Sequence, residues 1–378
     1  MKKMGFIKLG SSNDSPIGIE MGSTSIKMAQ LKKTARGWAV RDTLIKEMDL
    51  STNENGESRM DALVNIIKEC MKESSFSGRS VVSVMPGHQL DILPVKLSLS
   101  GDESVEDAIV EKARAHLSYD VENAVIDYIP VEDGKTVPEK GRPARYLLIS
   151  ARREDVDNHL SILKMARLKP VALDISACAL ARVIRFSRTE KDNNVLVINA
   201  GSQHTSLTLV WKNNILLDRT ILWGRENLIE SLMNRLKLNR QKAERLLSRN
   251  GQHRGHSEEP EQENEHLTHR SKPSEVVYEI VTNQVEKLSI EIEKVLQYFS
   301  SEMRGAVIDV LYLMGTSSTI QDLDAYLGKK TGISIQHFNP ADMLNMGKNA
   351  VSKDTNGYGA LFGVPVGLAM RGIREQDV

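Results

Sequence analysis

The sequence is short of the features that point to secreted, zinc-binding or nucleic-acid-binding proteins. Two cysteines, Cys70 and Cys178, stand alone in 378 residues, and their spacing fits neither a disulfide framework nor a zinc site. Aromatic residues make up 4% of the chain, too few for a surface on which single-stranded nucleic acid would stack. We therefore expect a protein of a reducing compartment, with no structural zinc and no nucleic-acid partner.

An excess of charge and a long apolar run are also missing. Fifty Lys and Arg residues balance fifty Asp and Glu residues, so the formal net charge is zero. The net charge therefore gives no reason to expect binding to nucleic acid or to an anionic membrane. No apolar run approaches the roughly 20 residues that span a bilayer, and the basic start is not followed by the apolar segment of a signal peptide. These absences predict a soluble, cytoplasmic protein.

A repeated strand-turn-strand pattern is the clearest feature that is present. Residues 17–31 read IGIEMGSTSIKMAQL and residues 195–210 read VLVINAGSQHTSLTLV, so in both an apolar strand enters a Gly-Ser pair and leaves as a second strand. The pairs Gly22-Ser23 and Gly201-Ser202 lie 179 residues apart, close to half of the chain. Because 378 residues exceed what one hydrophobic core usually holds, the repeat predicts two related α/β lobes.

Apolar periodicity divides the remainder of the chain. Each copy of the repeat continues into a third apolar stretch, 38–48 and 213–222, so a three-stranded meander opens each lobe. Helical spacing predicts helices over 60–74, 226–247 and 276–301, and small residues predict a closely packed helix over 358–371. The expected organisation is a loose tail at 1–15, a first lobe at 16–79 and 151–192, a small αβ subdomain inserted at 80–150, a second lobe at 193–371 and a polar tail at 372–378.

A polar stretch at 248–275 interrupts the second lobe. It is rich in His, Glu and Gly and nearly free of large apolar residues, as in segments that do not pack. Its histidines are compatible with a metal-binding tract, but no rigid apolar scaffold lies beside them. We predict a mobile, solvated insertion.

The composition of the two turns suits phosphate. A hairpin tip of Gly, Ser and Thr exposes backbone N–H groups with no side chain in the way, and its hydroxyls add donors. One such tip is usually an ordinary hairpin, whereas two at equivalent places of two lobes can hold a polyphosphate from both sides of a cleft. A third small-residue turn, 314–318, follows the end of an apolar strand. Ligands bind at the ends of strands in open α/β folds, so this turn is a candidate binding position for a nucleoside.

The order of these segments resembles the actin-like ATPase superfamily, and within it the PilM proteins of type IV pilus assembly. The resemblance runs from Ile17 to Gly372 and rests on IGIEMGSTSIK, VINAGSQHTSL, LLDRTILWGRENL, LYLMGTSSTIQDLDAYL and GVPVGLAMRG. It implies an α/β, two-lobed actin-like fold with a ribonuclease H-like duplication, in which 80–150 forms the subdomain termed 1C in PilM and in the cell-division protein FtsA. FtsA proteins end in an amphipathic membrane-binding helix, whereas this chain ends in REQDV, which favours PilM.

The resemblance also implies site residues. The first phosphate loop would consist of Gly22, Ser23, Thr24 and Ser25, with Lys27 just beyond it. The second would consist of Gly201, Ser202, Gln203, His204 and Thr205. The adenosine would meet Met314, Gly315 and Thr316, with Glu291 and Lys294 reaching its ribose or base. Asp174 falls where relatives carry a carboxylate that organises the attacking water, although it is equally well placed to cap the following helix.

Several positions depart from the superfamily pattern. Relatives carry Asp at the ends of the strands before the two phosphate loops, where carboxylates serve a magnesium ion, generally through its waters. This chain has Glu20 and Asn199 there, which leaves Glu20 as the candidate metal residue, and Met314-Gly315 and Gly224-Arg225 replace glycine pairs. The expected cofactor is ATP or ADP with magnesium in a degenerate site, with weak or no hydrolysis.

The function expected from these features is that of a cytoplasmic scaffold. The resemblance implies that the cytoplasmic N-terminal tail of a PilN-like single-span inner-membrane protein docks near residues 80–150. That contact would connect a pilus, or a related secretion or DNA-uptake machine, to the cytoplasm. An active ATPase or sugar-kinase relative is the alternative, although no catalytic Asp in a substrate cleft is apparent, and an FtsA-like filament former would require the membrane helix.

Overall fold

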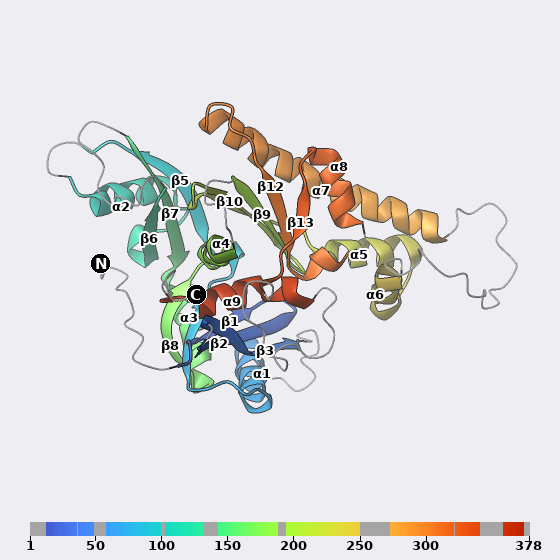
Figure 1. Cartoon of the computed structure of the whole chain (residues 1–378), viewed down its shortest axis with the longest axis horizontal. Helices are drawn as coiled ribbons and strands as arrows, with labels where there is room; N and C mark the ends of the chain where they lie inside the picture. The colour runs from blue at the N-terminus through green and yellow to red at the C-terminus, as the bar shows by residue number, and fades with distance from the viewer. Residues whose placement is uncertain are drawn as a thin grey trace, which may run out of the picture.

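The computed structural model describes residues 13–35, 37–48, 58–99, 103–131, 143–187, 194–249, 273–320, 322–340 and 358–373. Two five-stranded sheets and a separate three-stranded sheet form its framework (Figure 1). The greater part of the predicted N-terminal tail, of the insertion at 248–275 and of the polar C-terminal tail lies outside these residues. Within the described part, no helix combines the length and the apolar character needed to cross a bilayer.

The first lobe contains the sheet β3-β2-β1-β4-β8, in which β1 is antiparallel to β2 and parallel to β4. Its elements are β1 (Ile17–Met21), β2 (Ser25–Thr34), β3 (Gly37–Glu47), α1 (Arg59–Glu73), β4 (Ser80–Val84), α3 (Arg153–Met165) and β8 (Lys169–Asp174). Helix α1 begins where Ser58 accepts a hydrogen bond from the Asp61 N–H. Its buried Leu63 and Ile67 pack in one apolar cluster with Ile19 of β1, so the helix covers the opening meander as its periodicity predicts.

The second lobe repeats this plan with the sheet β11-β10-β9-β12-β13. Its elements are β9 (Val195–Ala200), β10 (Thr205–Trp211), β11 (Asn214–Ile221), α5 (Arg225–Leu236), α6 (Arg240–Arg249), α7 (Pro273–Glu302), β12 (Val310–Met314), α8 (Leu323–Thr331) and β13 (Ile335–His337). Strand β9 is antiparallel to β10 and parallel to β12, as β1 is to β2 and β4. The duplication predicted from the two Gly-Ser turns is confirmed.

The single helix predicted over 226–247 is wrong, because the chain forms two helices there. Lys237 adopts a left-handed conformation, with φ 54°, and ends α5. The side chain of Asn239 then accepts a hydrogen bond from the Lys242 N–H at 2.9 Å and starts α6. Apolar periodicity continued across this break, so it did not reveal the cap.

The small subdomain begins later than residue 80. Its sheet has the order β5-β7-β6, with β5 (Asp91–Leu97), β6 (Ala124–Pro130), β7 (Ala144–Arg152) and the helix α2 (Val105–His116), whereas β4 belongs to the first-lobe sheet. Tyr146 and Leu148 of β7 pack in a separate cluster with α2. Leu147 and Ile149, on the other face of the same strand, belong to the main core. The subdomain is therefore not self-contained.

The C-terminal helix returns to the first lobe. Helix α9 (Gly363–Ala369) follows the 3₁₀ turn η5 (Tyr358–Phe362) and packs against β1, β2 and α4 (Ser176–Ser187). Figure 1 shows α4 and α9 between the two large sheets. A Cβ atom on Gly18 would overlap the Pro365 carbonyl oxygen, and one on Gly367 would overlap that of Ala179. The expected assignment of all of 193–371 to the second lobe is thus wrong for this helix.

Candidate functional site

The two repeated turns have the same local geometry. The Gly22 N–H donates to the Ser25 carbonyl at 2.9 Å, and the Gly201 N–H donates to the His204 carbonyl at 3.0 Å. A Cβ atom on Gly22 would lie 2.9 Å from the Ser25 oxygen, and one on Gly201 would lie 2.6 Å from the His204 oxygen. Glycine is therefore required at the start of each turn, because any side chain would meet the carbonyl that closes it.

The turns also face each other across the two lobes. The Thr24 Oγ1 and Ser202 Oγ atoms are 2.7 Å apart and share a hydrogen bond, although the residues are 178 positions apart in the chain. The expectation that the two turns face each other across the two lobes is confirmed. In this arrangement the hydroxyls of the two turns satisfy each other.

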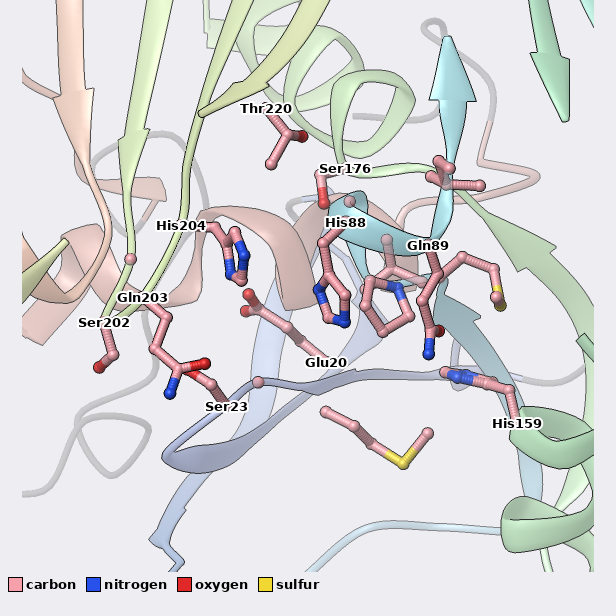
Figure 2. Close-up of a pocket in the computed structure, with 18 of the residues that line it drawn as sticks. Glu20, Ser23, His88, Gln89, His159, Ser176, Ser202, Gln203, His204 and Thr220 are labelled. Carbon is pink, nitrogen blue, oxygen red and sulfur yellow. The ribbon is translucent and has the colours of Figure 1, made fainter. Parts of the chain in front are cut away.

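A cavity of about 510 Å³ lies between the lobes beside these turns. Figure 2 shows Ser23 and Glu20 from the first lobe opposite Ser202, Gln203 and His204 from the second. The sequence-predicted residues that line it are Glu20, Gly22, Ser23, Thr24, Ser25, Lys27, Asn199, Gly201, Ser202, Gln203, His204 and Thr316.

Three predicted residues near the turns, Thr205, Met314 and Gly315, are not among those that line the cavity. The Thr205 hydroxyl is buried and donates to the Trp223 carbonyl at 2.9 Å. Gly315 has φ +90°, and a Cβ atom there would lie 2.5 Å from the Ala200 carbonyl oxygen and 2.6 Å from the Asn199 Oδ1. The glycine thus lets β12 turn against the end of β9. Met314, beside it, is fully buried.

Asp174 is held in ion pairs away from the cavity lining. Its Oδ2 atom lies 3.1 Å from Arg182 and 2.6 Å from Arg371, and its Oδ1 accepts a hydrogen bond from the Ile175 N–H at 2.9 Å. Arg182 also donates to the Gly367 carbonyl of α9. In this structure the carboxylate therefore joins β8, α4 and the C-terminal helix.

Glu291 and Lys294 also lie outside the lining of this cavity. Their side chains pair with each other at 2.6 Å, and Glu291 pairs with Arg219 of β11 at 2.8 Å. Glu291 lines a second cavity, of about 410 Å³, between the end of β11 and helices α5 and α7. Thr220 lines both cavities, so the two are neighbours.

The candidate metal residue, Glu20, already has a positive partner. It lies opposite Lys27 in the β1–β2 ladder, and the two side chains approach to 3.5 Å. Lys27 is 6% exposed, so water and salt weaken the attraction between the two charges less than they would at the surface. Of the two strand-end positions, Glu20 is the one whose carboxylate could serve a hydrated magnesium ion, because Asn199 contributes a neutral oxygen.

The N-terminus of helix α5 is hydrogen-bonded to the second turn. The Arg225 N–H donates to the Gly201 carbonyl at 3.3 Å, and the Glu226 N–H donates to the Ser202 carbonyl at 2.9 Å. A Cβ atom on Gly224 would overlap the Ser202 carbonyl oxygen, so this glycine permits the close approach. The positive end of the helix dipole consequently lies beside the turn and favours negative charge there.

Sequence reasoning missed several titratable residues of the cavity, among them Asp218 and His159. Asp218 lies inside β11, where its Oδ1 accepts a hydrogen bond from Thr208 at 2.6 Å, and burial raises its pKa to about 6. His159 of α3 shares a hydrogen bond of 2.8 Å with Ser83, and burial lowers its pKa to about 4. The one available signal was an aspartate within the apolar run of β11.

Comparison with known proteins places the chain in a family. A family model described as type IV pilus assembly protein PilM matches residues 18–373. The chain belongs to the PilM family. A chain of the solved PilM-PilN type IV pilus biogenesis complex superposes with a TM-score of 0.78 at 21% identity, covering 95% of this PilM-family chain and 99% of that one. The ethanolamine utilization protein EutJ from Carboxydothermus hydrogenoformans superposes with a TM-score of 0.54 at 13% identity, covering 95% and 89%. The predicted two-lobed actin-like fold is confirmed.

Proposed function

We propose that this PilM-family protein is a cytoplasmic scaffold of a type IV pilus or of a related secretion or DNA-uptake machine. The observation that carries the proposal is the match of the family model across residues 18–373. Similarity over nearly the whole length of a chain in the PilM-PilN complex supports it. The partner would be the cytoplasmic N-terminal tail of a PilN-like inner-membrane protein, and contact with the membrane would come through that partner.

The three-stranded sheet offers a place for an extended tail. Within the described residues β6 pairs with β7 on one side only, so its other edge presents backbone donors and acceptors. Strand β5, at the opposite edge, packs near β11 of the second lobe. Val125 of β6 is 37% exposed and adds an apolar contact. A tail that extends the sheet at β6 would gain main-chain hydrogen bonds and side-chain contacts together.

A point substitution tests this docking site better than a deletion, because Leu147 and Ile149 tie the sheet to the main core. Val125→Asp should weaken binding of the tail peptide of the neighbouring single-span protein by about tenfold, since a charge would be buried at the contact. Val307→Asp, at a valine that is 69% exposed between α7 and β12, is the matched control and should bind normally. Fluorescence anisotropy with the labelled peptide measures both. Equal affinity of the two variants would move the docking site away from β6.

We further propose that the interlobe cavity binds ATP or ADP with magnesium and hydrolyses ATP weakly or not at all. The two glycine turns supply backbone donors for phosphates. Phosphoryl transfer depends on accurate metal placement and charge stabilisation, for which Asn199 and the Lys27-paired Glu20 are poor substitutes for two aspartates. Purified protein should therefore bind nucleotide without measurable turnover. A turnover number of about one per second, within the range of working enzymes, would contradict this.

A further inference from the structure

Two histidines from different lobes stack at the interlobe cavity. His88 belongs to the 3₁₀ turn η1 (Gly87–Gln89) that follows β4, and His204 closes the second phosphate turn. Their ring centroids are 4.8 Å apart and their planes are inclined by 14°. Figure 2 shows the two rings side by side above the first turn, near Glu20.

The backbone holds η1 in this position. A Cβ atom on Gly87 would lie 2.6 Å from the Thr220 Oγ1 of β11, so the turn rests directly on the second-lobe sheet. His88 is therefore placed by a contact between lobes.

The other charged side chains of the cavity leave a polyphosphate without enough positive charge. Three carboxylates line it, against two cations, and Lys27 is already paired with Glu20 at 3.5 Å. The charged lining residues are Glu20, Asp155, Asp218, Lys27 and Arg59. With neutral histidines these five residues carry a net charge of −1. Entry of a nucleotide, which brings several negative charges, favours the uptake of a proton by any imidazole beside it.

We propose that His88 and His204 form a polyphosphate-binding pair that takes up one proton when a nucleotide enters, so that affinity rises as pH falls. This inference rests on the proposed nucleotide function and adds its regulation by pH.

The environment of the pair explains why the proton arrives with the ligand. Burial, and next the neighbouring His88, lower the pKa of His204 in the free protein, so its ring is neutral at pH 7. An adjacent phosphate reverses this balance because it favours imidazolium. Two imidazolium rings separated by 4.8 Å would repel each other, so the pair accepts one proton rather than two.

Other titratable groups face the same cavity and must be separated from the pair. His159, whose pKa burial lowers to about 4, stays neutral across the pH range of interest. Asp218, with a pKa raised to about 6 by burial, is a second possible proton acceptor. The test therefore includes Asp218→Asn as well as the histidine variants.

Isothermal titration calorimetry with MgATP at pH 7.5, in buffers of different ionisation enthalpy, counts the protons bound with the nucleotide. The unchanged protein should take up between about 0.5 and one proton, and its affinity should rise roughly three- to tenfold from pH 8 to pH 6.5. His204→Gln and His88→Gln should each reduce the uptake to near zero. His116→Gln, at an exposed histidine of α2, is the matched control and should retain it.

NMR titration of the imidazole resonances in the unchanged protein gives a second readout that needs no variant. The pKa of one ring of the pair should rise when MgATP binds. Tripolyphosphate, used as a second probe, separates this inference from the proposed function, since it has the charge but no adenosine. Proton uptake with tripolyphosphate and no binding of MgATP would retain the histidine pair and reject the nucleotide.

Three results would overturn the proposal. Binding of MgATP without proton uptake would reject the pair but leave the proposed function intact. Uptake that survives in both histidine variants and disappears in Asp218→Asn would assign the proton to Asp218. Absence of binding by both probes would reject the pair and the nucleotide site together.

Discussion

At the scale of single residues, the side chains at the ends of β1 and β9 decide how a metal ion would be held. Asn199 is neutral, and Glu20 is paired with Lys27 at 3.5 Å. Replacing both by Asp, as Glu20→Asp with Asn199→Asp, should raise ATP affinity in magnesium by about 10- to 100-fold, because carboxylates that hold metal-bound water have effects of this size. Affinity in EDTA should stay nearly constant. An equal gain with and without magnesium would show that the metal is not the cause.

Asp218 offers a second test at the same scale, through stability. Its pKa is about 6 in the folded protein, against 3.8 for an ordinary carboxyl. Between about pH 3.8 and pH 6 the folded protein therefore keeps this proton, whereas the unfolded chain has lost it. The stabilising effect of protonation is complete below about pH 3.8 and disappears as pH rises through about 6.

Asp218→Asn should accordingly stabilise the protein at pH 7.5 by up to about 3 kcal/mol, since each pKa unit corresponds to about 1.4 kcal/mol. An Asn oxygen can still accept the hydrogen bond of Thr208. Urea denaturation of both proteins at pH 4, 5.5 and 7.5 measures the difference, which should be smallest at pH 4. His159 titrates in both proteins and cancels in the comparison. A constant difference at every pH would assign the effect to packing.

At the scale of elements, α9 depends on glycine to reach α4. Gly367→Ala would place a methyl group against the Ala179 backbone, and such overpacking costs about 1–3 kcal/mol. Gly328→Ala in α8 is the matched control, because its new Cβ atom would lie 3.5 Å from the nearest atom, the Ile333 oxygen, an ordinary contact. Urea denaturation should show a loss of stability for the first variant and none for the second. Equal stability of the two would mean that α9 can shift without cost.

At the scale of the whole molecule, the hydrogen bond between the turns must open if phosphates bind between them. Thr24 Oγ1 and Ser202 Oγ lie 2.7 Å apart, so cysteines at both positions would be close enough to form a disulfide. The oxidised Thr24→Cys/Ser202→Cys protein should bind ATP at least about tenfold more weakly than its reduced form, which serves as the control for the substitutions. Calorimetry with and without reductant measures this. Equal affinity would place the phosphates elsewhere.

The sequence by itself determined the features that rest on local chemistry. Each Gly-Ser turn is closed by a hydrogen bond across three residues, from Gly22 to Ser25 and from Gly201 to His204, and glycine is the residue that fits there. Strand and helix periodicities were equally local, so the meanders, α1 and the duplication were predictable. The repeat then implied two lobes, because equivalent strands build equivalent sheets.

Only the tertiary structure decided which distant residues meet. The Thr24–Ser202 hydrogen bond and the stacking of His88 on His204 depend on how the two lobes close, which no local pattern encodes. Asp174 had two plausible roles from its position, and its ion pair with Arg371 exists because α9 returns to the first lobe. The assignment of β4 to the large sheet follows from pairing with β1, since a strand carries the same pattern in either sheet. Contacts between segments far apart in the chain arise from packing and backbone pairing, and these are properties of the folded molecule.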